Sequence, residues 1–198
     1  MDIRDIILQY RGVTEECLRD IDARVRILRV NTGCSLVRQG QVCDAFYFNR
    51  SGLMRVSHRT VDADNTILFG AAGDIFTSLH SYFAAEPSAF SLIALEESEV
   101  YELKYRDVEA LLTRHPDFMR WLMYIAIGQL YALERRYVKY ATTGAEQRFR
   151  NFMAQDQPYI KRVSAKVLTL RIPLKYIASY LQITPATLSR LRRKLARE

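Results

Sequence analysis

The chain has 198 residues, of which 49% are hydrophobic, and its 29 Lys and Arg residues outnumber 22 Asp and Glu residues for a net charge of +7. This length and composition suffice for one or two hydrophobic cores, and no run approaches the roughly 18 apolar residues of a membrane span. The first five residues, MDIRD, place charges where a signal peptide needs an apolar run. We therefore expect a cytoplasmic protein without a membrane partner.

Two short helices are predicted at the start of the chain. Apolar residues at helical spacing indicate the first one, which is amphipathic: Ile3, Ile6, Ile7 and Tyr10. Gly12 ends this pattern, and Thr14 is a suitable N-cap for a second helix that carries Leu18 and Ile21.

From about Val25 to Leu103, short apolar runs alternate with turn residues. These runs lie at 25–27, 36–37, 46–48, 53–56, 67–69, 92–95 and 100–103. Short strands at such even spacing are typical of an antiparallel sandwich or a barrel-like roll. We therefore assign residues 1–115 to a strand-rich N-terminal domain.

A long helix is predicted next, from Pro116 to about Tyr140, and we assign residues 116–141 to it. It carries two apolar stripes. One alternates spacings of four and three, as a coiled-coil seam does, and consists of Met119, Met123, Ala126, Leu130, Leu133 and Tyr137. The other consists of Phe118, Leu122 and Ile125. One stripe can cover the strand domain while the other pairs two subunits, or both can belong to an intramolecular core.

Residues 142–198 form the third predicted unit. Thr143 and Glu146 have the spacing of a capping box for a helix that buries Phe149, Phe152 and Met153. One or two strands are predicted over 163–172.

Two short helices joined by a tight turn are predicted over 173–198. The first has a buried face of Ile177, Ala178 and Leu181. Thr184 can cap the second helix, and Pro185 fits its first position.

The second of these helices has a buried and an exposed side. Leucines at i, i+3 and i+7 form the buried stripe, namely Leu188, Leu191 and Leu195. The outer face is left to Ala186, Ser189, Arg190 and Arg193. A helix that is held by its apolar side and points Ser and Arg outward fits a DNA major groove. The sequence therefore predicts a DNA-binding helix-turn-helix.

The positive charge of the chain is concentrated in its C-terminal quarter. Residues 1–143 hold 17 basic and 19 acidic side chains, whereas residues 144–198 hold 12 basic and 3 acidic ones, a net charge of +9. Such a surface attracts a polyanion, and the binding should depend strongly on salt. A basic solvated face without a partner is the alternative, but the adjacent helix pair favours double-stranded DNA.

The order of strand roll, long helix and basic helix-turn-helix resembles the Crp/Fnr regulators. Residues 40–56 resemble the family's glycine-bounded hairpin, residues 94–103 its last roll strands, and residues 172–193 the helix-turn-helix of its Bacteroidetes branch. The resemblance implies an α+β fold. Its parts are an antiparallel β-roll of the cyclic-nucleotide-binding type (a cupin-like double-stranded β-helix), a long dimerisation helix and a C-terminal winged-helix-like helix-turn-helix domain. It further implies a homodimeric transcription regulator that binds a palindromic operator, with RNA polymerase as a further candidate partner.

The sensor region departs from the family pattern. Members that bind cyclic nucleotides hold the ribose with a Gly-Glu pair and the phosphate with a later Arg. Here Thr77 and Ser78 replace Gly-Glu, and no Arg or Lys lies between Asp74 and Ala89. We therefore predict no binding of cyclic nucleotides through the usual contacts, and control by cAMP is not expected.

An unknown small-molecule effector remains a candidate partner of this region. The residues that we assign to its pocket are Phe76, Thr77, Ser78, His80 and Ser88. A histidine in this region, His80, resembles the haem-ligated sensors of the family, but one histidine is weak evidence and an ordinary pocket or surface histidine is the favoured alternative.

The DNA-reading helix departs as well, because Pro185 and Ala186 stand where members often present Arg or Glu. Arg190 is the best candidate for a bidentate guanine contact, with Ser189 as a second base contact. The candidate phosphate contacts are Ser179, Thr187, Arg193 and Lys194. Few base contacts predict a loose consensus or a greater reliance on DNA shape. Since the chain ends almost with this helix, we expect no wing hairpin after it.

Two other classes of function stay open. An enzyme is one, but the histidines are scattered and no Gly-x-Ser-x-Gly turn or phosphate loop occurs, so we expect no catalytic residues. Three widely spaced cysteines, Cys17, Cys34 and Cys43, likewise predict thiols rather than a disulfide, a metal site or a cofactor. The other class is a ligand-binding sensor module whose DNA-binding domain is inactive without an effector or partner.

Overall fold

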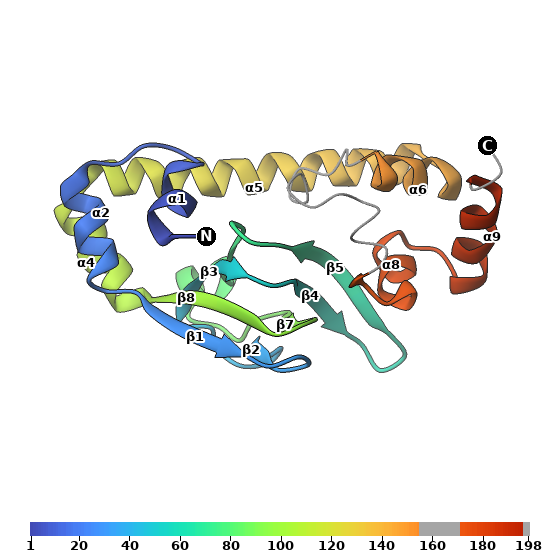
Figure 1. Ribbon diagram of the computed structural model, residues 1–198, viewed down its shortest axis with the longest axis horizontal. Coiled ribbons are helices and arrows are strands. Elements are labelled where there is room, and N and C mark those ends of the chain that lie inside the picture. The colour runs from blue at the N-terminus through green and yellow to red at the C-terminus, as the bar shows by residue number, and fades with distance from the viewer. Residues whose placement is uncertain (155–170, 196–198) are drawn as a thin grey trace.

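The computed structural model describes residues 1–154 and 171–195. It has the predicted α+β fold, in which a β-roll lies beside one long helix and further helices follow at the C-terminal end (Figure 1). The strands are β1 (Arg26–Val30), β2 (Ser35–Val37), β3 (Ala45–Ser51), β4 (Met54–Arg59), β5 (Asp64–Gly70), β6 (Ile75–Phe76), β7 (Ser91–Ala94) and β8 (Ser98–Lys104). The helices are α1 (Ile3–Leu8), α2 (Glu15–Asp22), α3 (Leu79–Ala84), α4 (Tyr105–Arg114), α5 (Pro116–Thr142), α6 (Ala145–Met153), α8 (Leu174–Tyr180) and α9 (Pro185–Leu195).

The roll consists of two antiparallel four-stranded sheets, in the orders β1-β8-β3-β6 and β2-β7-β4-β5. Side chains alternate along β3 because successive residues of a strand point to opposite faces. Ala45 and Tyr47 belong to the core inside the roll, whereas Phe46 and Phe48 belong to the core beneath the helices.

The seven apolar runs of the sequence correspond to the seven longer strands. Only the two-residue strand β6 was missed.

Helices α1, α2, α4 and the first half of α5 cover one outer side of the roll (Figure 1). Trp121 is the centre of this core: its ring stacks on Phe118 at 5.4 Å between centroids, and its indole N–H donates to the Ile7 carbonyl at 3.0 Å. Phe118, Leu122 and Ile125 are buried here, so this stripe of α5 covers the strand domain. None of the described helices is long and apolar enough to cross a membrane.

The predicted N-terminal helices are confirmed as α1 and α2, and the Thr14 hydroxyl accepts from the Cys17 N–H at 3.3 Å as the N-cap of α2. The predicted long helix is confirmed as α5. Helices α3 and α4 were not predicted. Helix α3 lies within the strand region, α4 follows directly on β8, and each offers only a short apolar pattern.

The start of α6 differs from the prediction. Its N-cap is Gly144, without a side-chain cap, and the Thr143 hydroxyl instead donates to the Lys139 carbonyl at the end of α5, at 2.5 Å. The predicted capping box was therefore wrong, because the last turn of α5 holds the hydroxyl. Phe149 and Phe152 are buried as predicted, but Met153 is 37% exposed. Of the strands predicted over 163–172, residues 163–170 lie outside the described residues.

Helices α8 and α9 form the predicted helix pair. One core buries Ile177 and Ala178 of α8, its C-cap Leu181, and Leu188 and Leu191 of α9. The Thr184 hydroxyl accepts from the Thr187 N–H at 3.1 Å, which confirms the predicted cap. Between the helices, Gln182 has a φ of +53°, a left-handed conformation that lets the chain turn within a few residues.

Arg148 of α6 holds this turn in place. Its guanidinium donates to the carbonyls of Leu181 at 2.9 Å, Gln182 at 3.4 Å and Thr143 at 2.7 Å. We expect Arg148→Met to destabilise the protein by about 1.5–3 kcal/mol, since it removes charge-assisted bonds from partly buried carbonyls. Urea unfolding followed by circular dichroism measures this.

Arg29→Met is the matched control, because the Arg29 side chain is 87% exposed and pairs at 3.1 Å with Glu99 on the neighbouring strand β8. Exposed pairs of this kind contribute about 0.2–1 kcal/mol. Equal losses in the two variants would show that Arg148 does not hold the turn.

Candidate nucleic-acid interface and effector cavity

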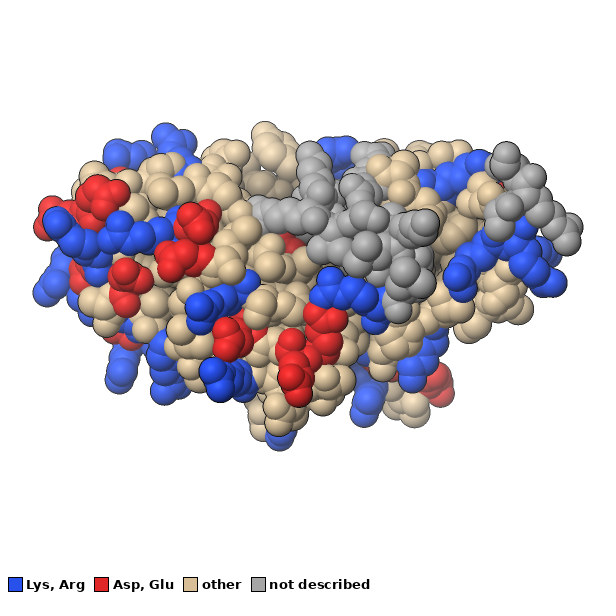
Figure 2. All heavy atoms as spheres, in the orientation of Figure 1, with Lys and Arg blue, Asp and Glu red and all other residues tan. Residues whose placement is uncertain are grey.

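The outer face of α9 is polar and positively charged. Because Leu188 and Leu191 hold the opposite side of the helix in the core, Ser189, Arg190 and Arg193 are exposed on its surface. Figure 2 shows Lys and Arg side chains gathered at the end of the molecule where α9 lies, whereas acidic and basic side chains are mixed at the opposite end. This end of the molecule therefore offers a cationic helix to a polyanion.

Thr187 and Lys194 have partners within the protein. The Thr187 hydroxyl forms a hydrogen bond with the Thr184 hydroxyl at 3.0 Å, and the Lys194 ammonium group binds the Glu146 carboxylate at 2.7 Å. Hydrogen bonds from Lys194 first and Arg150 second lower the pKa of the Glu146 carboxyl. Lys194 would have to leave this carboxylate to bind a phosphate. Arg192, which is not among the predicted DNA contacts, is also exposed on α9.

Ser179 lies apart from the other predicted DNA contacts. Its hydroxyl accepts from the backbone N–H of Thr66 on β5 at 2.8 Å and donates to the Asp64 carbonyl at 3.4 Å. Ser179 belongs to α8 and is half-buried where this helix packs against the β4–β5 hairpin. In this arrangement the hydroxyl is bound to the roll.

A buried arginine extends the same contact. Arg55 of β4 is 1% exposed, and its guanidinium donates to the Asp64 carboxylate at 2.7 Å and to the Thr66 hydroxyl at 2.9 Å. The pKa of the Asp64 carboxyl is lowered, mainly by the hydrogen bond from Arg55. The guanidinium carbon also lies 3.9 Å from the centre of the Tyr176 ring of α8, a cation–π contact. Arg55 thus joins the hairpin to the helix-turn-helix.

Apolar residues of the roll complete this junction. Leu53, Phe69 and Ala71 share one core with the C-terminal helices, and the rings of Phe69 and Tyr180 lie 5.4 Å apart. The helix-turn-helix is therefore docked on the roll by both polar and apolar contacts. Sequence reasoning missed this junction, although Arg55 within the apolar run 53–56 was a signal for a buried ion pair.

A cavity of about 460 Å³ lies between strands β4–β6 and helix α5. Its walls are mostly apolar and include Phe69, Ile75 and Ile125. Among the described residues that line it, none is Arg or Lys, and one carries a carboxylate. This residue is Asp74, which accepts from the Ala71 N–H at 2.7 Å.

Two of the five predicted pocket residues, Phe76 and Thr77, line this cavity, whereas the other three do not. Ser78 is fully buried and caps α3 by accepting from the Ser81 N–H. His80 is exposed and bonds Glu86 at 2.7 Å. The Ser88 hydroxyl donates to the Phe90 carbonyl at 2.9 Å. More of the lining residues come from α5 than from the predicted pocket residues, and the sequence pattern could not place this helix against the strands.

Titration with cAMP or cGMP is expected to give no saturable heat of binding. A cyclic phosphate in this cavity would meet the Asp74 carboxylate and, among the described wall residues, no cation to offset its charge. Isothermal titration calorimetry of the purified full-length chain measures this directly. A saturable isotherm in the micromolar range would refute the argument from charge.

Comparison with known proteins fits this architecture. Residues 27–115 match the family of cyclic nucleotide-binding domains. No curated protein sequence matches the chain. Among solved structures, FixK2 from Bradyrhizobium japonicum is similar with a TM-score of 0.75 and 17% identity, covering 87% of this chain and 84% of that one.

Two further structures match nearly the whole chain. A CooA mutant from Carboxydothermus hydrogenoformans has a TM-score of 0.71 and 18% identity, covering 100% of this chain and 86% of that one. The catabolite activator protein of Thermus thermophilus has a TM-score of 0.57 and 21% identity, covering 95% of this chain and 86% of that one.

Residues 27–115 are therefore a domain of the cyclic nucleotide-binding type. The chain as a whole, with its long helix and C-terminal helices, has the fold of the Crp/Fnr regulators, which confirms the resemblance found in the sequence.

Proposed function

We propose that the protein is a homodimeric transcription regulator that binds a palindromic DNA site with α9. The observation that carries this proposal is the cationic outer face of α9, where Arg190, Arg193 and Ser189 are exposed while the leucine side is fixed in a core. A major groove admits such a helix, and its guanine edges accept two hydrogen bonds from one guanidinium. The name of one structural neighbour, the catabolite activator protein of Thermus thermophilus, supports the same class.

The exposed apolar stripe of α5 supports the dimer. Of the six residues predicted to form a coiled-coil seam, five are large and exposed: Met119, Met123, Leu130, Leu133 and Tyr137. The exposed fraction reaches 64% at Leu133 and 77% at Tyr137. Since the opposite stripe already covers the roll, this one is free to pair with the same helix of a second copy. A two-fold dimer would present two copies of α9 to two half-sites.

The cavity between the roll and α5 supports a small-molecule effector of a particular kind. Its walls are mostly apolar, and no Arg or Lys occurs among the wall residues that the structure describes. A neutral, largely apolar molecule would bind there without an unpaired charge. Helix α5 lines both this cavity and the proposed dimer interface, so occupancy of one can affect the other.

The contacts of Ser179 favour the alternative function. In this alternative the protein is a sensor module whose helix-turn-helix is inactive until an effector or partner acts. We assign a phosphate contact to its hydroxyl, but here it is bound to Thr66 and Asp64 of the roll. The hydroxyl has one proton and cannot donate it to the Asp64 carbonyl and to a DNA phosphate at the same time. Under this alternative, the junction between α8 and β5 must open before the helix pair binds DNA.

Salt dependence tests DNA binding by α9. We expect the affinity for duplex DNA, measured by fluorescence anisotropy between about 50 and 200 mM salt, to fall steeply as phosphate counterions are released. Arg193→Ala should weaken binding about equally on all sequences and reduce the salt slope by about 1.

Arg106→Ala is the control for this measurement, because Arg106 is an exposed cation on α4, within residues 1–143, whose net charge is negative. It should leave the slope unchanged. A slope that is insensitive to Arg193 but sensitive to Arg106 would place the DNA on another surface and refute the proposal.

A further inference from the structure

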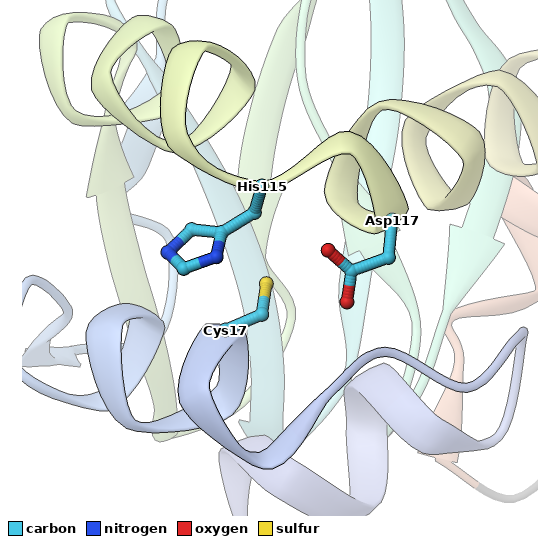
Figure 3. Close-up of side chains that lie close together, drawn as sticks. All are labelled: Cys17, His115 and Asp117. Atoms are coloured by element: carbon cyan, nitrogen blue, oxygen red, sulfur yellow. The ribbon is translucent and has the colours of Figure 1, made fainter.

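Three potential metal ligands meet at the end of the molecule opposite α9. They are Cys17 of α2, His115 between α4 and α5, and Asp117 in the first turn of α5 (Figures 1 and 3). The ligand atoms that they offer, a sulfur, a ring nitrogen and a carboxylate oxygen, all lie within 4.8 Å of one another. In Figure 3 the imidazole and the carboxylate face the sulfur from opposite sides.

Neighbouring groups orient two of these ligands. Nε2 of His115 bonds the Asp20 carboxylate at 3.0 Å, which leaves Nδ1 as the ring nitrogen on the side of Cys17. A histidine that donates its second ring N–H to a carboxylate is the usual arrangement at zinc, because this bond fixes the tautomer and raises the basicity of the ligand nitrogen. Asp117 is fixed by the Thr14 N–H, which donates to its Oδ2 at 2.6 Å.

Burial and charge also favour a cation at this place. Cys17 is fully buried and His115 is 7% exposed, so a bound ion would be shielded from solvent. The Asp20 carboxylate already has Arg24 as a partner at 3.0 Å. By contrast, no Lys or Arg forms an ion pair with Asp117 within the part of the chain that the structure describes. A divalent cation would balance the carboxylate and a thiolate together.

We propose that Cys17, His115 and Asp117 bind one divalent cation of the zinc class, with a fourth position left for water. Sulfur, nitrogen and carboxylate oxygen are the three ligand types that zinc takes from proteins, at about 2.0–2.3 Å. Tetrahedral ligands at these bond lengths lie about 3–4 Å apart, so ligand atoms that are now within 4.8 Å of one another need to approach by about 1–2 Å at most. The ion would join α2 to the start of α5 and stabilise the folded chain. This proposal is independent of DNA binding.

The sequence could not show this site. His115 and Asp117 are two residues apart, but Cys17 precedes them by almost half the chain. The expectation of no metal site rested on the wide spacing of the cysteines and of the histidines along the sequence. Folding brings the three together because α2 lies against the junction of α4 and α5.

Cobalt is the probe for the test, because a thiolate bound to Co²⁺ gives an intense ultraviolet charge-transfer band. The full-length protein, reduced and treated with a chelator that is then removed, is titrated with Co²⁺ and afterwards with Zn²⁺. We expect one Co²⁺ per chain with a thiolate band, and displacement of the Co²⁺ by Zn²⁺. Cys17→Ser should abolish the band, whereas Cys34→Ser, a change of the exposed cysteine, should preserve it.

Asp20→Asn tests the orienting carboxylate without removing a ligand, and it should weaken Zn²⁺ binding about 10- to 100-fold. Circular dichroism in chelator verifies that each variant is folded. If Cys17→Ser does not fold, His115→Gln takes its place and should weaken Co²⁺ binding at least as much as Asp20→Asn does. The absence of a thiolate band in the wild-type protein, or its loss in Cys34→Ser instead of Cys17→Ser, would overturn the proposal.

Discussion

Replacing Leu130 and Leu133 of α5 by glutamate should convert the protein to a monomer and weaken its binding to a two-fold DNA site by at least about 100-fold. Both leucines lie on the exposed apolar stripe of α5, with exposed fractions of 54% and 64%. In the proposed dimer four carboxylates would enter one seam, where unpaired charges are strongly unfavourable. The loss of affinity follows because two linked binding units gain about 10²–10⁴-fold over one.

Light scattering after size-exclusion chromatography measures the mass of the double variant, and anisotropy measures its DNA binding. Val61→Glu is the matched control: this residue is fully exposed in the turn between β4 and β5, and the same change there should affect neither property. A double variant that keeps the mass of a dimer would show that α5 is not the interface. A wild-type protein that is monomeric at micromolar concentration would contradict the dimer itself.

The second large effect is expected at Arg190, where Arg190→Ala should weaken binding to the specific site by about 1–3 kcal/mol. That loss corresponds to about a 5- to 150-fold increase in Kd. Arg190 is exposed on the side of α9 that faces away from the buried Leu188 and Leu191, which is the face that would enter the groove. A guanidinium that binds both acceptors of one guanine makes this contact specific for one base pair.

The sequence preference of the variant decides the role of Arg190. A base contact predicts that the preference relaxes at one position of each half-site, while binding to unrelated duplexes changes little. Arg193→Ala serves as the comparison, since a phosphate contact weakens all sequences alike. If Arg190→Ala also lost the same factor on every duplex, Arg190 would be a phosphate contact and the base assignment would be wrong.

The parts of the fold that depend on local spacing could be predicted from the sequence. The leucine stripe of α9, the Thr184 cap and the two stripes of α5 follow from residues three or four positions apart, which lie on one side of any helix. Strands of the roll were also visible, because apolar runs between turn residues indicate strands without any knowledge of their partners. The β-roll itself came from the family resemblance, and the order of its strands in two sheets was not predicted.

What remained hidden depends on contacts between distant parts of the chain. Ser179 looks like a DNA contact from its place in the helix pair, and only the fold shows that Thr66 binds its hydroxyl. The effector cavity needs α5 against the strands, so the local stretch 76–88 supplied only Phe76 and Thr77. The cluster of Cys17 with His115 is of the same kind. Spacing along the chain carries no information about such pairs.

Selection of binding sequences from random duplex DNA tests the central claim most directly. It would use the purified full-length protein without added effector, at near-physiological salt. We predict enrichment of an inverted repeat whose half-site centres are about one helical turn apart, as two copies of α9 in a two-fold dimer require. No enrichment, with binding only at low salt, would contradict a regulator that reads DNA on its own and would favour the sensor whose helix-turn-helix stays inactive without an effector or partner.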